Sequence, residues 1–209
     1  MNTVCFKSRL QKLASWRMTL WLCLFGLVLQ LCLPVYANGE NQEKVDQIKV
    51  AYLVNFMRLT TWKDLQADPQ TPPFTITIVS GEDFAQTMQQ AFVDGKFNDR
   101  KVVIHHLPQK AFKKGTLSQA DEQLLSGSHL IYMHDAGLAE LQTFQRSNIK
   151  PDYLLVGDMP QFAEYGGMIG LRQDQSGISF TVNLKEIRQS SIHVSSKLLR
   201  LGVKVRGKD

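Results

Sequence analysis

The chain has 209 residues, of which 44% are hydrophobic and 21% are charged. These values predict one domain, or one domain with a short extension, and they exclude a disordered chain and a polytopic membrane protein. The net charge is +5, but residues 1–37 hold four basic residues and no acidic one, which leaves 24 − 4 = 20 basic against 19 acidic residues over 38–209. A nucleic-acid-binding protein that depends on a basic surface field is therefore excluded.

Residues 1–37 have the layout of a secretory signal peptide. A basic stretch precedes an apolar run of 16 residues from Met18 to Leu33, and Pro34 and then Ala37, at the cleavage position, follow. The run is short for a membrane-spanning helix, which needs roughly 20 residues. We expect cleavage and export of a single domain over residues 38–209, and the alternative is an uncleaved anchor in the inner membrane. All three cysteines precede residue 38, so we expect a core without disulfides.

The first predicted element of the exported chain is a helix. Apolar residues recur at helical spacing from Val45 to Leu59, and further apolar residues surround the helix between 50 and 59. A helix that is apolar on most sides is either buried on several sides or contacts a partner. Aromatic and methionine side chains are enriched at interface cores. Our first candidate contact with a partner therefore consists of Tyr52, Phe56 and Met57.

Strand-like and helical stretches then alternate along the chain. Runs rich in β-branched and aromatic residues predict strands, at 74–79, 101–107, 129–134 and 153–156. The stretches between them predict helices, at 83–92, 117–125 and 136–146. This order predicts an α/β fold with a mostly parallel sheet and helices on both faces. Two apolar runs that flank Asp174–Gly177 predict an antiparallel β-hairpin near the C-terminus.

The sequence contains no recognisable catalytic or metal-binding motif. His105 and His106 would point to opposite faces of a strand, so they cannot chelate one ion together. Ligands of open parallel sheets bind beyond the carboxyl ends of the strands. The polar residues at these ends form our predicted ligand crevice: Ser80, Gly81, His134, Asp135 and Asp158.

The C-terminal stretch is basic and offers a second candidate contact. Its basic side chains could steer an acidic partner, and the alternative is a solvated surface without a partner. The residues concerned are Lys197, Arg200 and Lys204.

Four motifs occur in order along the chain: KVAYLVNFMRLTTW at 49–62, VGDMPQFAEYGGMIGL at 156–171, FTVN at 180–183 and SSKLLRL at 195–201. Together they resemble the YfiR/HmsC-like family of bacterial periplasmic proteins, over about residues 44–205. We expect Gly166 or Gly167 to have a positive φ or a close backbone neighbour. The resemblance implies structural roles for Asn55, Trp62, Asp158, Phe162, Gly166, Gly167, Asn183, Ser195 and Ser196.

The resemblance implies a periplasmic regulator that is not an enzyme and uses no cofactor or metal. Members of the family act on a membrane-bound diguanylate cyclase, hold down cyclic-di-GMP synthesis and so affect biofilm formation. The implied partner is the periplasmic domain of such a cyclase or a similar sensor protein, and a homodimer is left open. The alternatives are a periplasmic sensor or adaptor that binds a small ligand in the strand-end crevice and, third, an exported hydrolase.

Overall fold

The computed structural model describes residues 34–67, 72–79, 81–92, 94–112 and 115–205. The chain divides into two units after Val45, within helix α2 (Pro34–Arg58), and the unit from Asp46 onward is described below. Most of the predicted signal peptide, and Ser80 of the predicted crevice, lie outside the described residues. No helix in the described part of the chain is long and apolar enough to cross a membrane.

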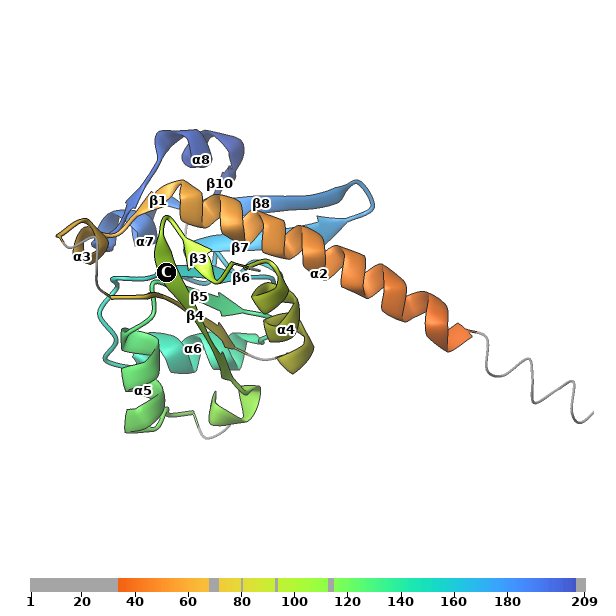
Figure 1. Cartoon of the computed structure of the whole chain (residues 1–209), viewed down its shortest axis with the longest axis horizontal. Coiled ribbons are helices and arrows are strands. Elements are labelled where there is room, and N and C mark those ends of the chain that lie inside the picture. The colour runs from red at the N-terminus through yellow and green to blue at the C-terminus, as the bar shows by residue number, and fades with distance from the viewer. Residues whose placement is uncertain (1–33, 68–71, 80, 93, 113–114, 206–209) are drawn as a thin grey trace, which may run out of the picture. The chain divides into compact units, whose positions relative to one another are not determined.

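The strands of this unit form one large sheet and one small pairing. The large sheet contains β2 (Phe74–Val79), β3 (Lys96–Phe97), β4 (Arg100–Leu107), β5 (Leu130–Met133), β6 (Leu154–Gly157), β7 (Ile169–Asp174), β8 (Gly177–Asn183) and β10 (Val203–Val205). Its eight strands lie in the order β10-β8-β7-β6-β5-β2-β4-β3 (Figure 1). A separate pair joins β1 (Thr60–Thr61) to β9 (His193–Val194).

The large sheet is parallel from β7 to β4. Strand β8 runs antiparallel to β7, with Leu171 opposite Phe180, and this pairing is the predicted hairpin. Strand β10 lies parallel to β8 at one end of the sheet, and β3 lies antiparallel to β4 at the other. The predicted α/β fold with a mostly parallel sheet and a C-terminal antiparallel hairpin is therefore confirmed.

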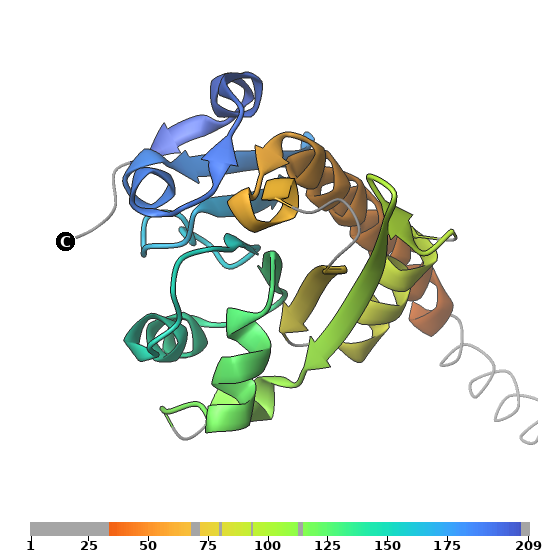
Figure 2. The ribbon, with the colours of Figure 1, turned by 60° about the vertical axis from the view of Figure 1, so that its left-hand side comes forward.

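Helices cover both faces of the sheet, with α2 and α4 on one side and α5 and α6 on the other (Figure 2). The chain passes from β2 through α4 and β3 to the neighbouring strand β4, and then from β4 across β2 to β5. Because such connections are right-handed, the reversal of direction places α4 and α5 on opposite faces. The helices that follow α2 are α3 (Lys63–Ala67), α4 (Glu82–Gln90), η1 (Gln109–Phe112), α5 (Gln119–Ser126), α6 (Leu138–Arg146), α7 (Leu184–Gln189) and α8 (Ser196–Leu201).

Most of the large apolar side chains of α2 between residues 50 and 57 belong to the core of the domain. Phe56 and Met57 are 2% and 0% exposed, and the Phe56 ring centre lies 5.0 Å from that of Phe180 in β8. Tyr52 is partly buried, and its hydroxyl donates to the Ile178 carbonyl at 2.6 Å. The expected partner contact is therefore wrong for Phe56 and Met57, because the hairpin and the sheet already cover them. Tyr52 binds the same hairpin through this hydrogen bond.

The motif that follows β6 builds a tight support around Phe162. This ring is 1% exposed, and it occupies space that two glycines leave open. A Cβ added to Gly157 would lie 2.4 Å from Phe162 Cε2, and one added to Gly167 would lie 2.1 Å from Phe162 Cε1. Gly166 has a φ of +99°, which confirms the positive φ expected for the Gly-Gly pair. Asn183 Nδ2 donates to the Ala163 carbonyl at 2.7 Å and so ties the motif to the end of β8.

Candidate functional site

The strand order creates one point where ligands commonly bind an open α/β sheet. The chain leaves β2 toward β4 and leaves β5 toward β6, so the connections diverge between these two neighbouring strands. Such divergence marks the usual ligand crevice beyond the carboxyl ends. The structure brings His134, Asp135 and Asp158 together here, and a Cβ on Gly81 would lie 2.9 Å from His134 Cδ2. Four of the five predicted crevice residues are therefore neighbours.

The Asp158 carboxylate is the centre of this cluster. Its Oδ2 accepts hydrogen bonds from Lys49 Nζ at 2.7 Å, from the Tyr132 hydroxyl at 2.7 Å and from His134 Nδ1 at 2.8 Å. Its Oδ1 accepts a fourth from the backbone N–H of Asp135 at 2.8 Å. The side chains of Lys49, His134 and Asp158 are each 7% exposed. Lys49, Tyr132, His134 and Asp158 thus form a buried, hydrogen-bonded network, and the Asp135 side chain, 75% exposed, lies at its outer side.

The network moves the pKa values of Asp158 and Tyr132 away from neutral pH. Burial acts to raise the pKa of Asp158, but the hydrogen bonds and charges of His134 and Lys49 outweigh it and hold that pKa well below its usual value. Burial, followed by the charge of Asp158, raises the pKa of Tyr132 well above its usual value. Asp158 therefore stays ionised and Tyr132 stays neutral, so neither is matched to general acid–base catalysis near pH 7.

The same cluster brings together three side chains of the kind that bind metal ions. His134, Asp135 and Asp158 each offer one ligand atom, and these atoms lie within 4.8 Å of one another. However, the Lys49 ammonium lies 2.7 Å from Asp158 Oδ2, and its positive charge would repel a cation held at that oxygen. The chemistry of the donors thus fits an internal ion pair better than a metal centre.

Lys49 is the functional neighbour that sequence reasoning missed. It comes from α2, 109 residues before Asp158, and helical periodicity alone gives no sign that its charged end is buried. One signal was available, because Lys49 opens the first motif and Asp158 lies near the start of the second. Because these two opposite charges lie in two motifs of the same family, a buried ion pair between them could have been proposed. In the structure, Lys49 closes the crevice from the side of α2.

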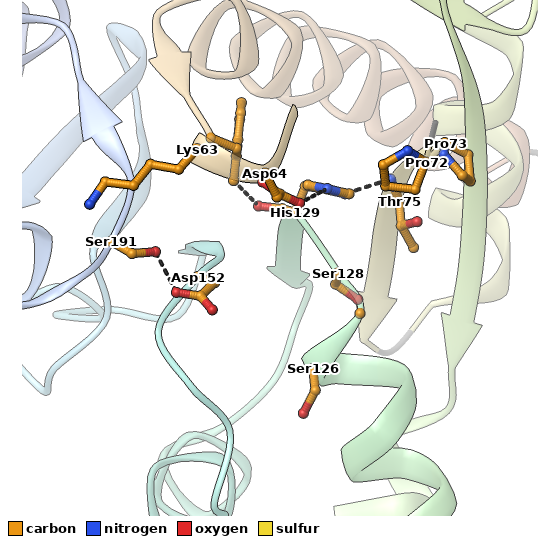
Figure 3. A pocket seen from close by; sticks show the side chains of 12 residues that line it. Lys63, Asp64, Pro72, Pro73, Thr75, Ser126, Ser128, His129, Asp152 and Ser191 are labelled. Atoms are coloured by element: carbon orange, nitrogen blue, oxygen red, sulfur yellow. Dashed lines mark hydrogen bonds and ion pairs between the residues drawn. The ribbon is translucent and has the colours of Figure 1, made fainter. Parts of the chain in front are cut away.

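A cavity of about 560 Å³ lies at the opposite, amino-terminal edge of the sheet (Figure 3). At its wall, His129 Nδ1 accepts a hydrogen bond from the Thr75 N–H at 2.9 Å, and His129 Nε2 lies 3.1 Å from Asp64 Oδ2. The cavity is lined by Trp62, Lys63, Asp64, Pro72, Pro73, Thr75, Ser126, Gly127, Ser128, His129, Asp152 and Ser191.

Two carboxylates in this cavity, those of Asp64 and Asp152, accept hydrogen bonds from uncharged donors that fix their orientation. Because His129 Nδ1 accepts from a backbone N–H, its proton is on Nε2, and the neutral ring donates that proton to Asp64. The Ser191 hydroxyl similarly donates to Asp152 (Figure 3). With Lys63 as the cation among the lining residues, the formal charge of the lining is +1 − 2 = −1. The cavity is therefore suited to a small polar molecule with a positive group.

The remaining predicted residues lie apart from both places, except for Trp62. Trp62 is buried, and its Nε1 donates to the His129 carbonyl at 3.0 Å. Ser195 caps α8 by accepting from the Lys197 N–H, and Ser196 is exposed. Asn55 is also exposed, in a groove between α2 and α4. The exposed basic residues of the tail are Lys197, Arg200 and Lys204.

Comparison with family models supplies a finding of a different kind. Residues 46–203 match a model described as YfiR/HmsC-like, which covers more than half of the 209 residues. The search of curated proteins gave no match. The matched range includes the network around Asp158, the cavity and the motif around Phe162.

Proposed function

The chain belongs to the YfiR/HmsC-like family of periplasmic regulators, and we propose that it represses a membrane-bound diguanylate cyclase by binding the periplasmic domain of that enzyme. The regulator acts without chemistry of its own. Its binding favours the inactive state of the cyclase by as much as its affinity for the two states differs. Cyclic-di-GMP synthesis and biofilm formation fall as a result. Residues 1–37 direct the export that this function requires.

The closed crevice is the observation that carries this proposal. In open α/β enzymes, substrate binds beyond the carboxyl ends of the strands, where the connections diverge. In this chain that place lies beside β2 and β5, and Lys49 neutralises the Asp158 carboxylate there. Both side chains are 7% exposed, so a substrate would have to displace a buried ion pair. The family to which the chain belongs is regulatory, which agrees with a function exerted through its surface.

Deletion of the gene from its bacterial host is expected to raise cellular cyclic-di-GMP and to thicken biofilm, because the cyclase loses its repressor. Mass spectrometry of cell extracts measures the nucleotide, and crystal-violet staining measures the biofilm. A plasmid copy of the whole chain should restore the parental level, whereas a copy without residues 1–37 should stay in the cytoplasm and restore nothing. Unchanged cyclic-di-GMP in the deletion strain contradicts the proposal.

A second candidate function, the sensing of a small polar molecule, is favoured by the cavity with its two oriented carboxylates. We expect some amine-bearing compounds to raise the melting temperature, since a ligand at a hundred times its Kd stabilises a protein by about 2.7 kcal/mol. A thermal-shift screen of polar metabolites measures this. Asp152→Asn should abolish the shift, whereas Asp174→Asn in the exposed hairpin should keep it. A shift that survives Asp152→Asn excludes the cavity.

A further inference from the structure

We propose that the outer edge of β10, together with the end of α8, is the surface that binds the partner. The occupant is an extended segment of the partner, apolar with acidic residues, which adds a strand beside β10. The identity of the partner as a cyclase rests on the proposed function, whereas the location of the surface rests on the features of the domain that follow.

Two apolar side chains at this edge are largely exposed to solvent. Leu201 at the end of α8 is 67% exposed and Val203 in β10 is 64% exposed, whereas Leu198 of the same helix is 1% exposed. Helix α8 thus packs one side into the core and leaves Leu201 outside it. Single exposed apolar residues are ordinary, but two within three residues on a sheet edge form a small apolar contact surface.

Strand β10 is an edge strand. One side of it pairs in parallel with β8, with Val203 opposite Thr181 and Lys204 opposite Val182. It ends the strand order of the large sheet (Figure 1), so its other side faces no strand in the described part of the chain. An edge strand presents unpaired backbone N–H and C=O groups to which an extended peptide can add. Side-chain pockets and charges then select the peptide.

The charges around this edge select an acidic segment. Lys197, Arg200 and Lys204 are exposed, and none of them forms an ion pair with any residue that the structure describes. Basic side chains beside an apolar contact favour encounter with an acidic partner. A second copy fits less well, because a two-fold contact would bring the basic side chains of both copies to the same edge, and like charges across paired strands destabilise the pair.

The edge is held in place by close packing beneath it. A Cβ added to Gly202 would lie 2.4 Å from Val182 Cγ2 and 2.6 Å from Phe180 Cε2, so the backbone that enters β10 rests directly on β8. Phe180 in turn contacts Phe56 of α2. Because β10 is already ordered in its paired position, little of its conformational entropy is lost when a partner binds.

Charge substitutions at this edge test the proposal. The variants are Leu201→Glu, Val203→Glu and Lys204→Glu, introduced into the full chain in the deletion strain. The matched controls are Ile48→Glu, at an apolar residue 48% exposed on α2, and Lys110→Glu, at an exposed lysine in η1. We expect the edge variants to lose repression by about fivefold or more, the loss that corresponds to a contact worth about 1 kcal/mol. Their periplasmic amounts and melting temperatures should match those of the controls.

A photo-crosslinking amino acid at Val203 identifies the occupant directly. We expect irradiation to join position 203, but not position 110, to the periplasmic domain of the cyclase, as mass spectrometry of the product would show. A product of two copies of this chain, or no product at position 203, overturns the proposal. If the parent chain represses and the edge variants repress equally, this surface is wrong while the proposed function stands. If deletion leaves cyclic-di-GMP unchanged, the cyclase is wrong, and the surface stands only if the peptide joined to position 203 is an apolar segment with acidic residues; any other peptide overturns it.

Discussion

Asp158→Asn is expected to lower the free energy of unfolding by about 3–5 kcal/mol, the usual effect of removing one partner of a buried ion pair. The reason is that the Lys49 ammonium, 7% exposed, loses the carboxylate at 2.7 Å and stays buried with only the more distant Asp46 carboxylate, at 3.9 Å, as counter-charge. For a chain of this size, such a loss lowers the melting temperature by about 6–20 °C. Urea denaturation of the parent and the variant measures the difference.

Lys49→Met provides the matched control for this effect. It removes the cation and leaves Asp158 with the donors Tyr132, His134 and the Asp135 N–H, so we expect a smaller loss. The double variant should be less destabilised than the sum of the two single variants, because the two residues act as a pair. Strict additivity of the two effects contradicts the network.

The acid dependence of stability gives a second measurement on Asp158. The pKa of this carboxyl is lower in the folded protein than the ordinary value of about 3.9 in an unfolded chain. Its contribution to stability is therefore complete above the unfolded value and is lost as the pH falls below it. Between about pH 5 and pH 3, the parent should lose stability more steeply than Asp158→Asn. Parallel curves for the two proteins contradict this assignment.

Gly167→Ala is expected to lower the free energy of unfolding by about 3 kcal/mol, at the upper end of the usual cost of overpacking a core. The added Cβ would lie 2.1 Å from Phe162 Cε1. The ring cannot move away freely because it also packs against Gly157, where an added Cβ would lie 2.4 Å from Phe162 Cε2. Chemical denaturation of purified protein measures the loss.

Two further variants separate this clash from an ordinary glycine effect. Gly127→Ala adds the same methyl group where the nearest atom is 3.6 Å away, so it should change stability little. Phe162→Leu makes room beside residue 167, and the double variant with Gly167→Ala should recover part of the loss relative to the sum of both changes. A Gly167→Ala protein as stable as the Gly127→Ala protein contradicts the close packing of residue 167 against Phe162.

The sequence predicted the layers of the fold because its signals are local. Alternating runs such as 74–79 and the turn at Asp174–Gly177 indicate strands and a hairpin directly. The helix from Val45 to Leu59 was ambiguous for a physical reason. Its apolar circumference fits either burial on several sides or a partner, and only the packing of Phe180 against Phe56 decides for the core.

The candidate site was predicted only in part. The carboxyl-edge residues His134, Asp135 and Asp158 were expected from strand ends alone, and they do meet. Their state was not predictable, since it depends on Lys49 from a helix 109 residues away. The cavity at the other edge was not predicted, because its lining comes from several connecting segments. Sequence periodicity does not show how close such segments lie to one another. His129 and His134, although five residues apart, lie at opposite ends of β5 and hydrogen-bond different carboxylates.

The long-range contacts of α2 have a consequence for the order in which the chain can fold. Lys49 binds Asp158, Tyr52 binds Ile178, and Thr60 pairs with Val194, so the earliest part of this domain to leave the ribosome docks on the latest. Until the β7–β8 hairpin has been synthesised, the apolar side of α2 lacks part of its cover, including Phe180. Contacts between residues so far apart in sequence form slowly. A nascent chain of this kind remains unfolded for longer, and the Lys49–Asp158 ion pair can close only after residue 158 has been synthesised. In the proposed export, this delay would keep the chain in the unfolded state that a secretory channel can thread.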